Sequence, residues 1–591
     1  MTHTTTRWTI CAALAVATAC GGGNSTTKES APAPAPAQAK APGDSPFVPP
    51  PIVVDYNLPD VKIDGATGSL PLSSAASYGW SAFIALNWPA STAAGTRGAP
   101  DTTKTFGQPG TPAWITMRSK VEVYPGNASA TVAPHGVVLN SSGQPTNGPD
   151  YGYGDAQQYY YASGLLNPCT GQAKVPSPAL VVLDETTQIG NNQTFAGVAP
   201  PDPSGYNTKP QLIRYSVKMN KPFYAYAIGG QYWYPGTPLQ TATNNFLTAL
   251  YSGQNQDPNP PFVNFAPSQP DPNLAGIEIK SSWRPLTSDE LKSGHFVTST
   301  VRYYEQPDGT TSCYREATWG LVGMHVISFS IAAPWVIWTS FEQTDNILTA
   351  EGKPTEDVNG NVLIPASSPT TPTLTSDPNA PKPVVTAGGP FCANPGKQLY
   401  FQESPAFGTN LPSGGNICVN GRWTAPEPIF VTANGKAHDV IAAYLASHGG
   451  GASPLSYYKL VAAQGVPIDY DARNGGTFST NTAYYSANAT IETDYSLGNF
   501  TGLLLAGVPA ANLGGKPFNN TQLLPFQARR LGIAPLRAGG CAGCHGVAAK
   551  SGQDFSFALA NNVAQPEKTN ALKKPDPLRN YFKPDLLTRL R

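Results

Sequence analysis

The chain has 591 residues, a formal net charge of zero, only 13% charged residues, 58 glycines and 60 prolines. This length is enough for more than one domain with a core. So much glycine and proline favours turns and short strands over long helices. A neutral chain lacks the basic signature of a nucleic-acid-binding protein, so no nucleic-acid partner is expected. We expect an α+β fold, with a large β-rich body, short helices and long loops.

The first 20 residues have the features of an export signal. Arg7 supplies a positive charge, and an apolar run of small residues follows from Trp8 to Ala19. This run is too short to span a bilayer, which takes about 20 apolar residues. It ends at Cys20, which three glycines follow. The pattern resembles the lipidation site of bacterial lipoproteins, with Ala17 where leucine is commoner. We expect a lipid on Cys20; the alternative is ordinary cleavage after Ala19.

The expected domains follow from composition along the chain. Residues 1–20 are a lipoprotein-type signal peptide, and 21–68 are a disordered tether rich in proline and alanine. Residues 69–515 form the body, with a proline- and threonine-rich loop at 365–390. Residues 516–591 form a short helical C-terminal segment. No later stretch is apolar enough to cross a membrane, so we expect membrane contact only through the N-terminal lipid. The protein is then exported to the periplasm or cell surface, as an outer-membrane lipoprotein.

The sequence of the first half of the body predicts three helices and two strands. The apolar run Trp80–Pro89 predicts a buried helix that Pro89 ends, and Trp114–Tyr124 predicts a second helix. Leu180–Leu183 and Pro222–Ala227 read as strands. Thr241–Tyr251 is expected to form a short helix.

Residues 274–346 are expected to form the structural centre. Ile277–Lys280 and Phe296–Tyr304 predict strands, and Thr287–Glu290 fits a capping box that opens a short helix. Two largely apolar runs follow, Thr318–Ile327 and Trp335–Glu342, and both are expected to be buried. Further along, Lys436–Ser447 predicts another helix.

Eight cysteines divide into groups with different expected roles. Cys11 leaves with the signal peptide, and three others belong to the lipidation site and to a C-terminal motif. The remaining four are Cys169, Cys313, Cys392 and Cys418. In an exported protein four cysteines suggest two disulfides, with three possible connectivities. Cys392 with Cys418 would close a local loop, which leaves Cys169 with Cys313. The long spacings lack the close pairs of a zinc site.

The C-terminal motif is Cys541-Ala542-Gly543-Cys544-His545. This spacing is the attachment signature of c-type haem. Two thiols add across the haem vinyl groups, and the adjacent histidine ligates the iron. A chance pairing, a redox dithiol or half of a zinc site are the alternatives. Export and the flanking glycines favour one covalent haem c, bound by Cys541 and Cys544 with His545 as proximal ligand.

The second axial ligand is not evident from the motif. No methionine follows Met324 and no histidine follows His545, so the large body is expected to supply a ligand unless the iron is open or takes a non-standard one. His325 is the first candidate, because its apolar run would place it in a dry pocket. The other candidates are Met324, His135, His295, His438 and His448. Two histidine ligands would favour electron transfer, whereas an open iron would favour peroxidase- or oxygenase-like chemistry.

Charge is distributed unevenly between the body and the C-terminal end. Residues 529–591 hold 11 Lys and Arg against 4 Asp and Glu. One interpretation is a basic tail lying on an acidic body. The other is that these cations pair with haem propionates or steer an acidic redox partner.

Several motifs together resemble a known group of proteins. They are the run Trp80–Pro89, the stretches Gly320–His325 and Trp335–Glu342, and the motif Cys541–His545 with the downstream Asp554–Phe557. Over about residues 75–560 the chain resembles large exported bacterial proteins of the cytochrome c family. The resemblance implies a single haem on a short appendix to a large body, and no established substrate.

The first functional hypothesis is therefore a lipid-anchored, exported monohaem cytochrome c that passes electrons to an unknown redox partner. A haem enzyme with an open iron is the second. A third is a β-rich binding protein whose haem is structural or sensory, with a Tyr- and Trp-rich body that recognises a ligand.

Overall fold

The computed structural model describes most of the strands and helices of the body and a few positions near the C-terminus. The described residues are 48–62, 70–124, 131–157, 167–172, 180–183, 193–195, 213–233, 275–305, 311–328, 336–349, 352–364, 400–402, 417–418, 422, 425–465, 470–471, 477–478, 486, 488–491, 541, 545, 556 and 558. The expected signal peptide (1–20), its Cys20 and the loop at 365–390 lie outside them.

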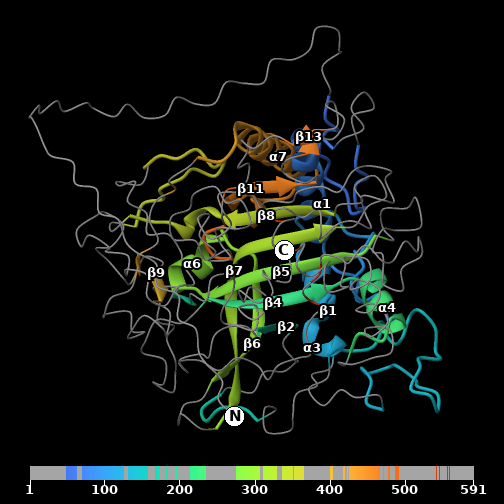
Figure 1. The fold of residues 1–591 in the computed structure, drawn as a ribbon. Coiled ribbons are helices and arrows are strands. Elements are labelled where there is room, and N and C mark those ends of the chain that lie inside the picture. The colour runs from blue at the N-terminus through green and yellow to red at the C-terminus, as the bar shows by residue number, and fades with distance from the viewer. Residues whose placement is uncertain are drawn as a thin grey trace, which may run out of the picture. The chain divides into compact units, whose positions relative to one another are not determined.

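The centre of the body is an eight-stranded sheet, so the expectation of a β-rich body is confirmed. Its strands are β1 (Arg118–Ser119), β2 (Val181–Leu183), β4 (Arg214–Met219), β5 (Ile277–Pro285), β6 (Thr298–Glu305), β7 (Cys313–Ser328), β8 (Ile337–Gln343) and β11 (Tyr458–Gln464). All pairs in this sheet are antiparallel except β2 with β6. Figure 1 shows β11, β8, β7, β5 and β4 side by side in this order. The 16-residue β7 pairs with β5, β6 and β8, so it organises the sheet.

Two short sheets and several helices complete the described structure. The short sheets contain β3 (Gln193–Phe195), β9 (Tyr400–Gln402) and β10 (Ile417–Cys418), and then β12 (Tyr470–Asp471) and β13 (Thr477–Phe478). The helices are α1 (Leu72–Leu86), α2 (Ala113–Thr116), α3 (Lys120–Val123), α4 (Lys221–Gly229), α6 (Ser288–Ser293) and α7 (Pro428–Ser447), with 3₁₀ turns η3 (Thr344–Asn346) and η4 (Pro454–Tyr457).

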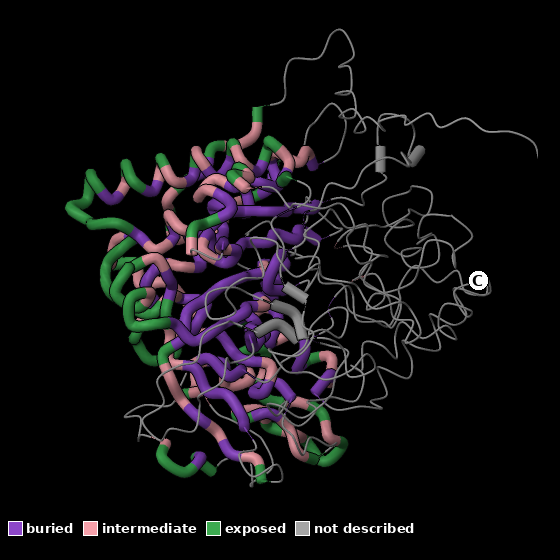
Figure 2. Tube along the Cα trace, turned by 90° about the vertical axis from the view of Figure 1, so that its left-hand side faces the viewer, coloured by how far each residue is buried: buried purple, intermediate pink, exposed green. Residues whose placement is uncertain are grey.

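Helix α1 forms the main core contact of the body. It packs against α7, β8 and β11, and its residues from Ser74 to Leu86 are buried. Phe83 stacks on Phe341 of β8 with ring centroids 4.1 Å apart. At Gly79 a Cβ atom would come within 2.7 Å of the Thr339 methyl group, so only glycine allows this close approach of helix to strand. Figure 2 shows the buried residues in the interior of the described body and the exposed residues on its outside.

One asparagine side chain joins α7 to both of its neighbours. Asn434 Oδ1 accepts hydrogen bonds from Trp80 Nε1 and from the Leu460 backbone N–H, each at 2.8 Å. Its amide nitrogen donates to the Leu460 carbonyl at 3.1 Å. The amide nitrogen also donates to the Asn359 carbonyl at 2.8 Å. The amide is therefore fully hydrogen bonded, and it holds α1, α7 and β11 in one relative position.

The expected helix at Trp80–Pro89 is confirmed and begins earlier, at Leu72. It ends at Leu86, three residues before Pro89, and the Asn87 side chain donates to the Phe83 carbonyl at 2.8 Å. Residues 48–62, which the sequence assigns to the tether, pack against this region. Ile52 and Val61 are buried in the main core.

The predicted helix at Trp114–Tyr124 is wrong, because the segment divides into α2, β1 and α3. The chain becomes extended at Met117, and Arg118–Ser119 pairs with β4. Ser119 then opens α3 through a capping box with Glu122.

The predicted strand at Pro222–Ala227 is wrong as well, since these residues lie in α4. Asn220 caps this helix by accepting from the Phe223 N–H at 3.1 Å, and Pro222 lies in its first turn. Both residues are typical of a helix start. The sequence therefore did contain a signal for the start of a helix. The aromatic, β-prone residues that follow it led to the wrong prediction of a strand.

The other predictions for the body differ in outcome. The strands expected at 180–183, 277–280 and 296–304, the capping box at Thr287 and the helix that ends at Ser447 are all present. The two apolar runs become β7 and β8. The helix expected at Thr241–Tyr251 lies outside the described residues.

Cys169 and Cys313 form a disulfide that joins the loop before β2 to the start of β7. The predicted pairing of Cys169 with Cys313 is therefore confirmed. Cys392 and the side chain of Cys418 lie outside the described residues, so their pairing remains a prediction.

We expect Phe83→Ala to lower the free energy of unfolding by about 3–5 kcal/mol, because it empties the ring site between α1 and β8. Urea titration followed by tryptophan fluorescence measures the loss. Leu291→Ala on α6, where the side chain is 44% exposed, is the control and is expected to change stability by less than about 0.5 kcal/mol. Equal losses in both variants would contradict this view of the core.

Candidate functional site

The two described residues of the C-terminal motif are Cys541 and His545. Both are half-buried and have helical backbone. They are four residues apart in the sequence. A thiol for a thioether bond and an imidazole for the iron are the groups that attachment of haem c uses. Cys544 lies outside the described residues.

His545 lies against the sheet of the body. Its ring packs on Trp338 of β8 with ring centroids 5.9 Å apart and an angle of 52° between the planes. Trp338 is buried. His545 of the motif is thereby in contact with β8. This strand pairs with β7, and His325 lies in β7.

The register of the central strands decides which side chains share the face that His545 contacts. Directly opposite residues of an antiparallel pair point to the same face, and so do residues two apart along a strand. Three rows across β5, β7 and β8 therefore lie on this face, which we call the polar face. The first row is Glu278, Ile327 and Trp338, the second is Lys280, His325 and Ser340, and the third is Ser282, Gly323 and Glu342.

His325 is thus one row from Trp338, on the face that His545 contacts. Two residues along a strand correspond to about 7 Å. The preceding residue, Met324, is opposite Phe341 and points to the other face, where Phe341 stacks on α1. Of the two adjacent candidates, the fold places His325 on the face that His545 contacts and turns Met324 to the other face.

A second contact of the C-terminal segment falls in the same first row. The Ser556 hydroxyl donates to Glu278 Oε2 and accepts a hydrogen bond from the Ala558 N–H at 3.2 Å. Ser556 is fully buried and Glu278 is 4% exposed. His545 therefore contacts the first row at β8, and Ser556 contacts it at β5. Strand β7 lies between these two strands.

The third row, together with Ser340 of the second row, is in contact with a different segment of the chain, residues 488–491. Asn488 Nδ2 donates to the Ser340 hydroxyl at 3.1 Å, and the hydroxyls of Thr490 and Ser282 are 2.8 Å apart. A Cβ atom at Gly323 would come within 2.3 Å of Thr490 Oγ1, so glycine is needed for this segment to lie flat on the sheet. His325 lies between the two covering segments and is half-buried.

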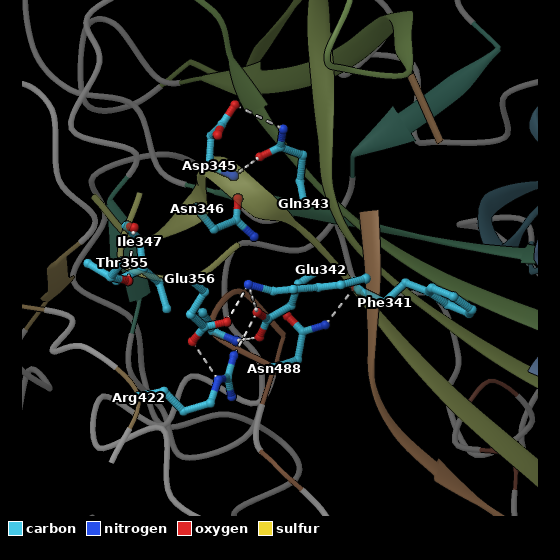
Figure 3. A network of polar contacts seen from close by, with 12 residues as sticks. Phe341, Glu342, Gln343, Asp345, Asn346, Ile347, Thr355, Glu356, Arg422 and Asn488 are labelled. Atoms are coloured by element: carbon cyan, nitrogen blue, oxygen red, sulfur yellow. Dashed lines mark hydrogen bonds and ion pairs between the residues drawn. The ribbon is translucent and has the colours of Figure 1, made fainter. Parts of the chain in front are cut away.

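A buried charge network anchors the segment that covers the third row (Figure 3). Arg422 donates to Glu342 Oε2 and Glu356 Oε1, each at 2.7 Å, and Lys459 also bonds Glu356. The Ala489 N–H donates to the second oxygen of Glu342 at 2.6 Å. Two cations and two carboxylates balance, as burial requires.

Electrostatics in this network keep the Glu356 carboxylate ionised. Burial alone would raise the pKa of Glu356, but the charges of Arg422 and Lys459 outweigh it and hold this pKa below its ordinary value. Burial also opposes the charge on Arg422, and the two glutamates nevertheless raise its pKa. Every group has a charged partner, so the network is structural.

A second buried charge cluster lies at the edge of the sheet, around β1 and β4. Lys218 donates to the carbonyls of Met117 and Leu180, and Glu122 pairs with Arg97 at 2.6 Å. Burial lowers the pKa of Lys218 to about 7. Its bonds to main-chain oxygens tie neighbouring segments to the sheet.

The other histidine candidates have partners elsewhere. His438 lies beside Trp80, bonds Asn359 and the Tyr458 carbonyl, and has a pKa lowered by burial. The remaining three pair with an aspartate or with a helix end: His135 with Asp155, His295 with Asp345, and His448 with the Tyr444 carbonyl. Among the candidate residues, the described structure brings only His325 onto the polar face.

Three residues of the candidate site were not predicted from the sequence: Trp338, Glu278 and Ser556. The sequence did contain one sign that Glu278 lies on a polar face. Polar side chains alternate along β5 as Glu278, Lys280 and Ser282, which is unusual in a strand that is buried on both faces.

No match is found when the chain is compared with protein-family models, with curated proteins and with solved structures.

Two further searches concern only the part of the chain that the structure describes. None of its helices is long and apolar enough to cross a membrane. It also contains no group of three or more His, Cys, Asp and Glu residues that could hold a metal ion. A haem needs only one or two side-chain ligands from the protein.

We expect Arg422→Met to lower the free energy of unfolding by about 3–5 kcal/mol at neutral pH, because it leaves buried carboxylates without their shared partner. In the wild type the pKa of Glu356 is depressed, so its stabilisation is present above the ordinary value of 4.5. It is lost as the pH falls through the lower folded value. Urea titrations at several pH values measure both effects.

Lys221→Met is the control, because Lys221 and Asp150 form an ion pair in which both side chains are more than half exposed. It is expected to cost less than about 1 kcal/mol. A similar small loss for Arg422→Met would contradict the anchoring role of the network.

Proposed function

We propose that this protein is an exported c-type haem protein that transfers electrons, with one haem attached through Cys541 and Cys544. His545 is the proximal iron ligand. The observation that carries the proposal is the C-x-x-C-H motif, whose last residue, His545, packs against Trp338 of the body. Haem c supplies reversible one-electron exchange when bound.

His325 is proposed as the second axial ligand. Three observations support it. It shares the polar face with Trp338, it lies one row from the contact of His545, and it is half-buried between two covering segments. An imidazole on each side of the iron favours electron transfer, since no position is then open to a substrate.

The residues around these imidazoles have separate tasks in the proposal. Trp338 packs against the His545 ring and restrains its orientation. Ile327 lies between Trp338 and Glu278 and keeps water out of the first row. Exclusion of water lowers the local dielectric constant, which is one way in which a protein tunes a redox centre.

The location and partners of the protein also belong to the proposal. A lipid on Cys20 would hold the body at the periplasmic or outer surface of a membrane, and the basic residues of 529–591 would pair with haem propionates or attract an acidic redox partner. The sequence motif of the signal supports this location.

We expect Cys541→Ser and Cys544→Ser to lose most covalently bound haem, because each removes one of the two thioether bonds. Haem staining of the denatured protein on a gel, together with a pyridine haemochrome spectrum, measures attachment. A variant that lacks both Cys169 and Cys313 is the control, because it removes thiols outside the motif. It is expected to keep its haem. A wild-type protein without covalent haem would refute the proposed function.

We expect His325→Ala to open the sixth position of the iron. The reduced variant is expected to bind carbon monoxide at least about tenfold more tightly than the wild type, because no protein ligand has to be displaced. Optical titration with carbon monoxide measures the affinity. His448→Ala at the exposed end of α7 is the control and should leave the affinity unchanged. Equally tight binding by the wild type would instead favour an enzyme with an open iron.

A further inference from the structure

The central sheet curls until its two ends lie close together. In the order of pairing, β4 lies next to the edge strand β1 at one end, and β2 is the edge strand at the other. Even so, β2 lies beside β4. Among the described residues no main-chain ladder joins these two strands. Val182 of β2 packs instead with Val121 of α3 and Tyr304 of β6, in a small apolar cluster apart from the main core.

Two buried cations of β4 bridge this junction. Lys218 donates hydrogen bonds to the Leu180 carbonyl, directly before β2, and to the Met117 carbonyl, directly before β1. Arg214 is four residues earlier on the same face of β4, and it donates to the Tyr304 carbonyl of β6 at 3.1 Å. Both cationic side chains are fully buried. Side-chain donors therefore do at this junction what main-chain N–H groups do elsewhere in the sheet.

The charges that face Lys218 compensate its own charge only in part. They are Glu122 of α3 and Arg97 of the loop before α2. The Glu122 carboxylate is bonded to Arg97 at 2.6 Å and lies 3.9 Å from Arg118, so three cations share it. Burial has the largest influence and lowers the pKa of Lys218 to about 7. In an open junction, where water reaches the amine, this pKa returns to its ordinary value of 10.5.

Packing at the junction is modest compared with the rest of the sheet. Strand β2 has three residues, and its pairing with β6 is parallel. Strand β7, in contrast, has 16 residues and is paired on both sides. Short segments with few backbone hydrogen bonds and few apolar contacts open at a lower free energy than core strands. The junction is therefore where the sheet is expected to open first.

We propose that the junction of β2 with β4, which we call the seam, is a proton-sensitive conformational device of the fold. The seam opens while β5, β7 and β8 stay paired, and Lys218 takes up a proton when it opens. Closure returns the amine to the two main-chain carbonyls and releases that proton. The inference does not depend on the haem and goes beyond the proposed function, because it gives the body a second state with one end of the sheet open to solvent.

The first test measures how often a buried thiol at the seam becomes accessible in the full-length protein as isolated. Val182→Cys places the thiol in the seam, and Val326→Cys places it in β7; both valines are at most 1% exposed. Alkylation with iodoacetamide, followed by mass spectrometry of the peptides, gives the rate at each position separately from the native cysteines. The thiol at position 182 is expected to react at least about tenfold faster than the thiol at position 326.

The pH dependence of this rate identifies the group that takes up the proton. Each rate is divided by the rate for the same variant unfolded in urea at the same pH, which removes the titration of the thiol itself. The closed seam binds fewer protons than the open seam between about pH 7 and 10.5, so raising the pH favours closure. The corrected rate for Val182→Cys is expected to fall about tenfold per pH unit above pH 7 and to be constant below it.

A second substitution in the Val182→Cys protein removes the titrating group. Lys218→Met keeps most of the bulk of the side chain, and it is expected to make the corrected rate independent of pH. Lys221→Met is the matched control, because Lys221 is three residues away in the sequence and its side chain is 53% exposed. It is expected to keep the slope of the Val182→Cys protein.

Hydrogen exchange of the wild type, followed by mass spectrometry, measures the same opening without any substitution. Peptides that contain Val181–Leu183 are expected to exchange before peptides from Met324–Ile327, after correction for their intrinsic rates. Equal rates for the two segments in either measurement would overturn the separate opening of the seam. A pH slope that persists in the Lys218→Met protein would refute the role of Lys218. Neither result bears on haem attachment, so the proposed function would stand.

Discussion

The register between β7 and β8 is the constraint on which the candidate site depends. It places His325 opposite Ser340 and Ile327 opposite Trp338. A slip of one residue would exchange the faces, so that Met324 would point to the C-terminal segment and His325 to helix α1. The register is held from the other face. Phe341 stacks on Phe83, and the close fit of Thr339 against Gly79 allows no side chain between helix and strand.

The two faces of the sheet are built by different physical means. The face toward α1 and α7 is packed by aromatic and aliphatic side chains, with Asn434 as a fully bonded polar residue among them. The polar face is covered by segments that hydrogen bond to it. Apolar packing is non-directional, whereas hydrogen bonds demand particular partners. The second face can therefore position a separate segment of the chain with more precision than apolar contact alone.

Buried charge on the polar face fits this division. The network of Glu342, Glu356, Arg422 and Lys459 joins β8 and β11 to distant segments. Such networks contribute little net stability compared with apolar packing, but they penalise any arrangement that leaves a charge unpaired. We infer that the network selects one position for the segment at Asn488.

Local patterns determined a definite part of this protein. The capping box at Thr287 and the apolar run from Trp80 predict helices that the structure contains, because neighbours in the sequence settle these features. The spacing of Cys541, Cys544 and His545 is likewise a local pattern, and it predicts haem attachment. The failures at Trp114–Tyr124 and Pro222–Ala227 arose where pairing with β4 or a cap at Asn220 outweighed the composition of the segment. Only the tertiary structure decided that His325, Trp338, Glu278 and Ser556 meet on one face. Their meeting depends on strand register and on contacts between residues hundreds of positions apart, which no local pattern contains.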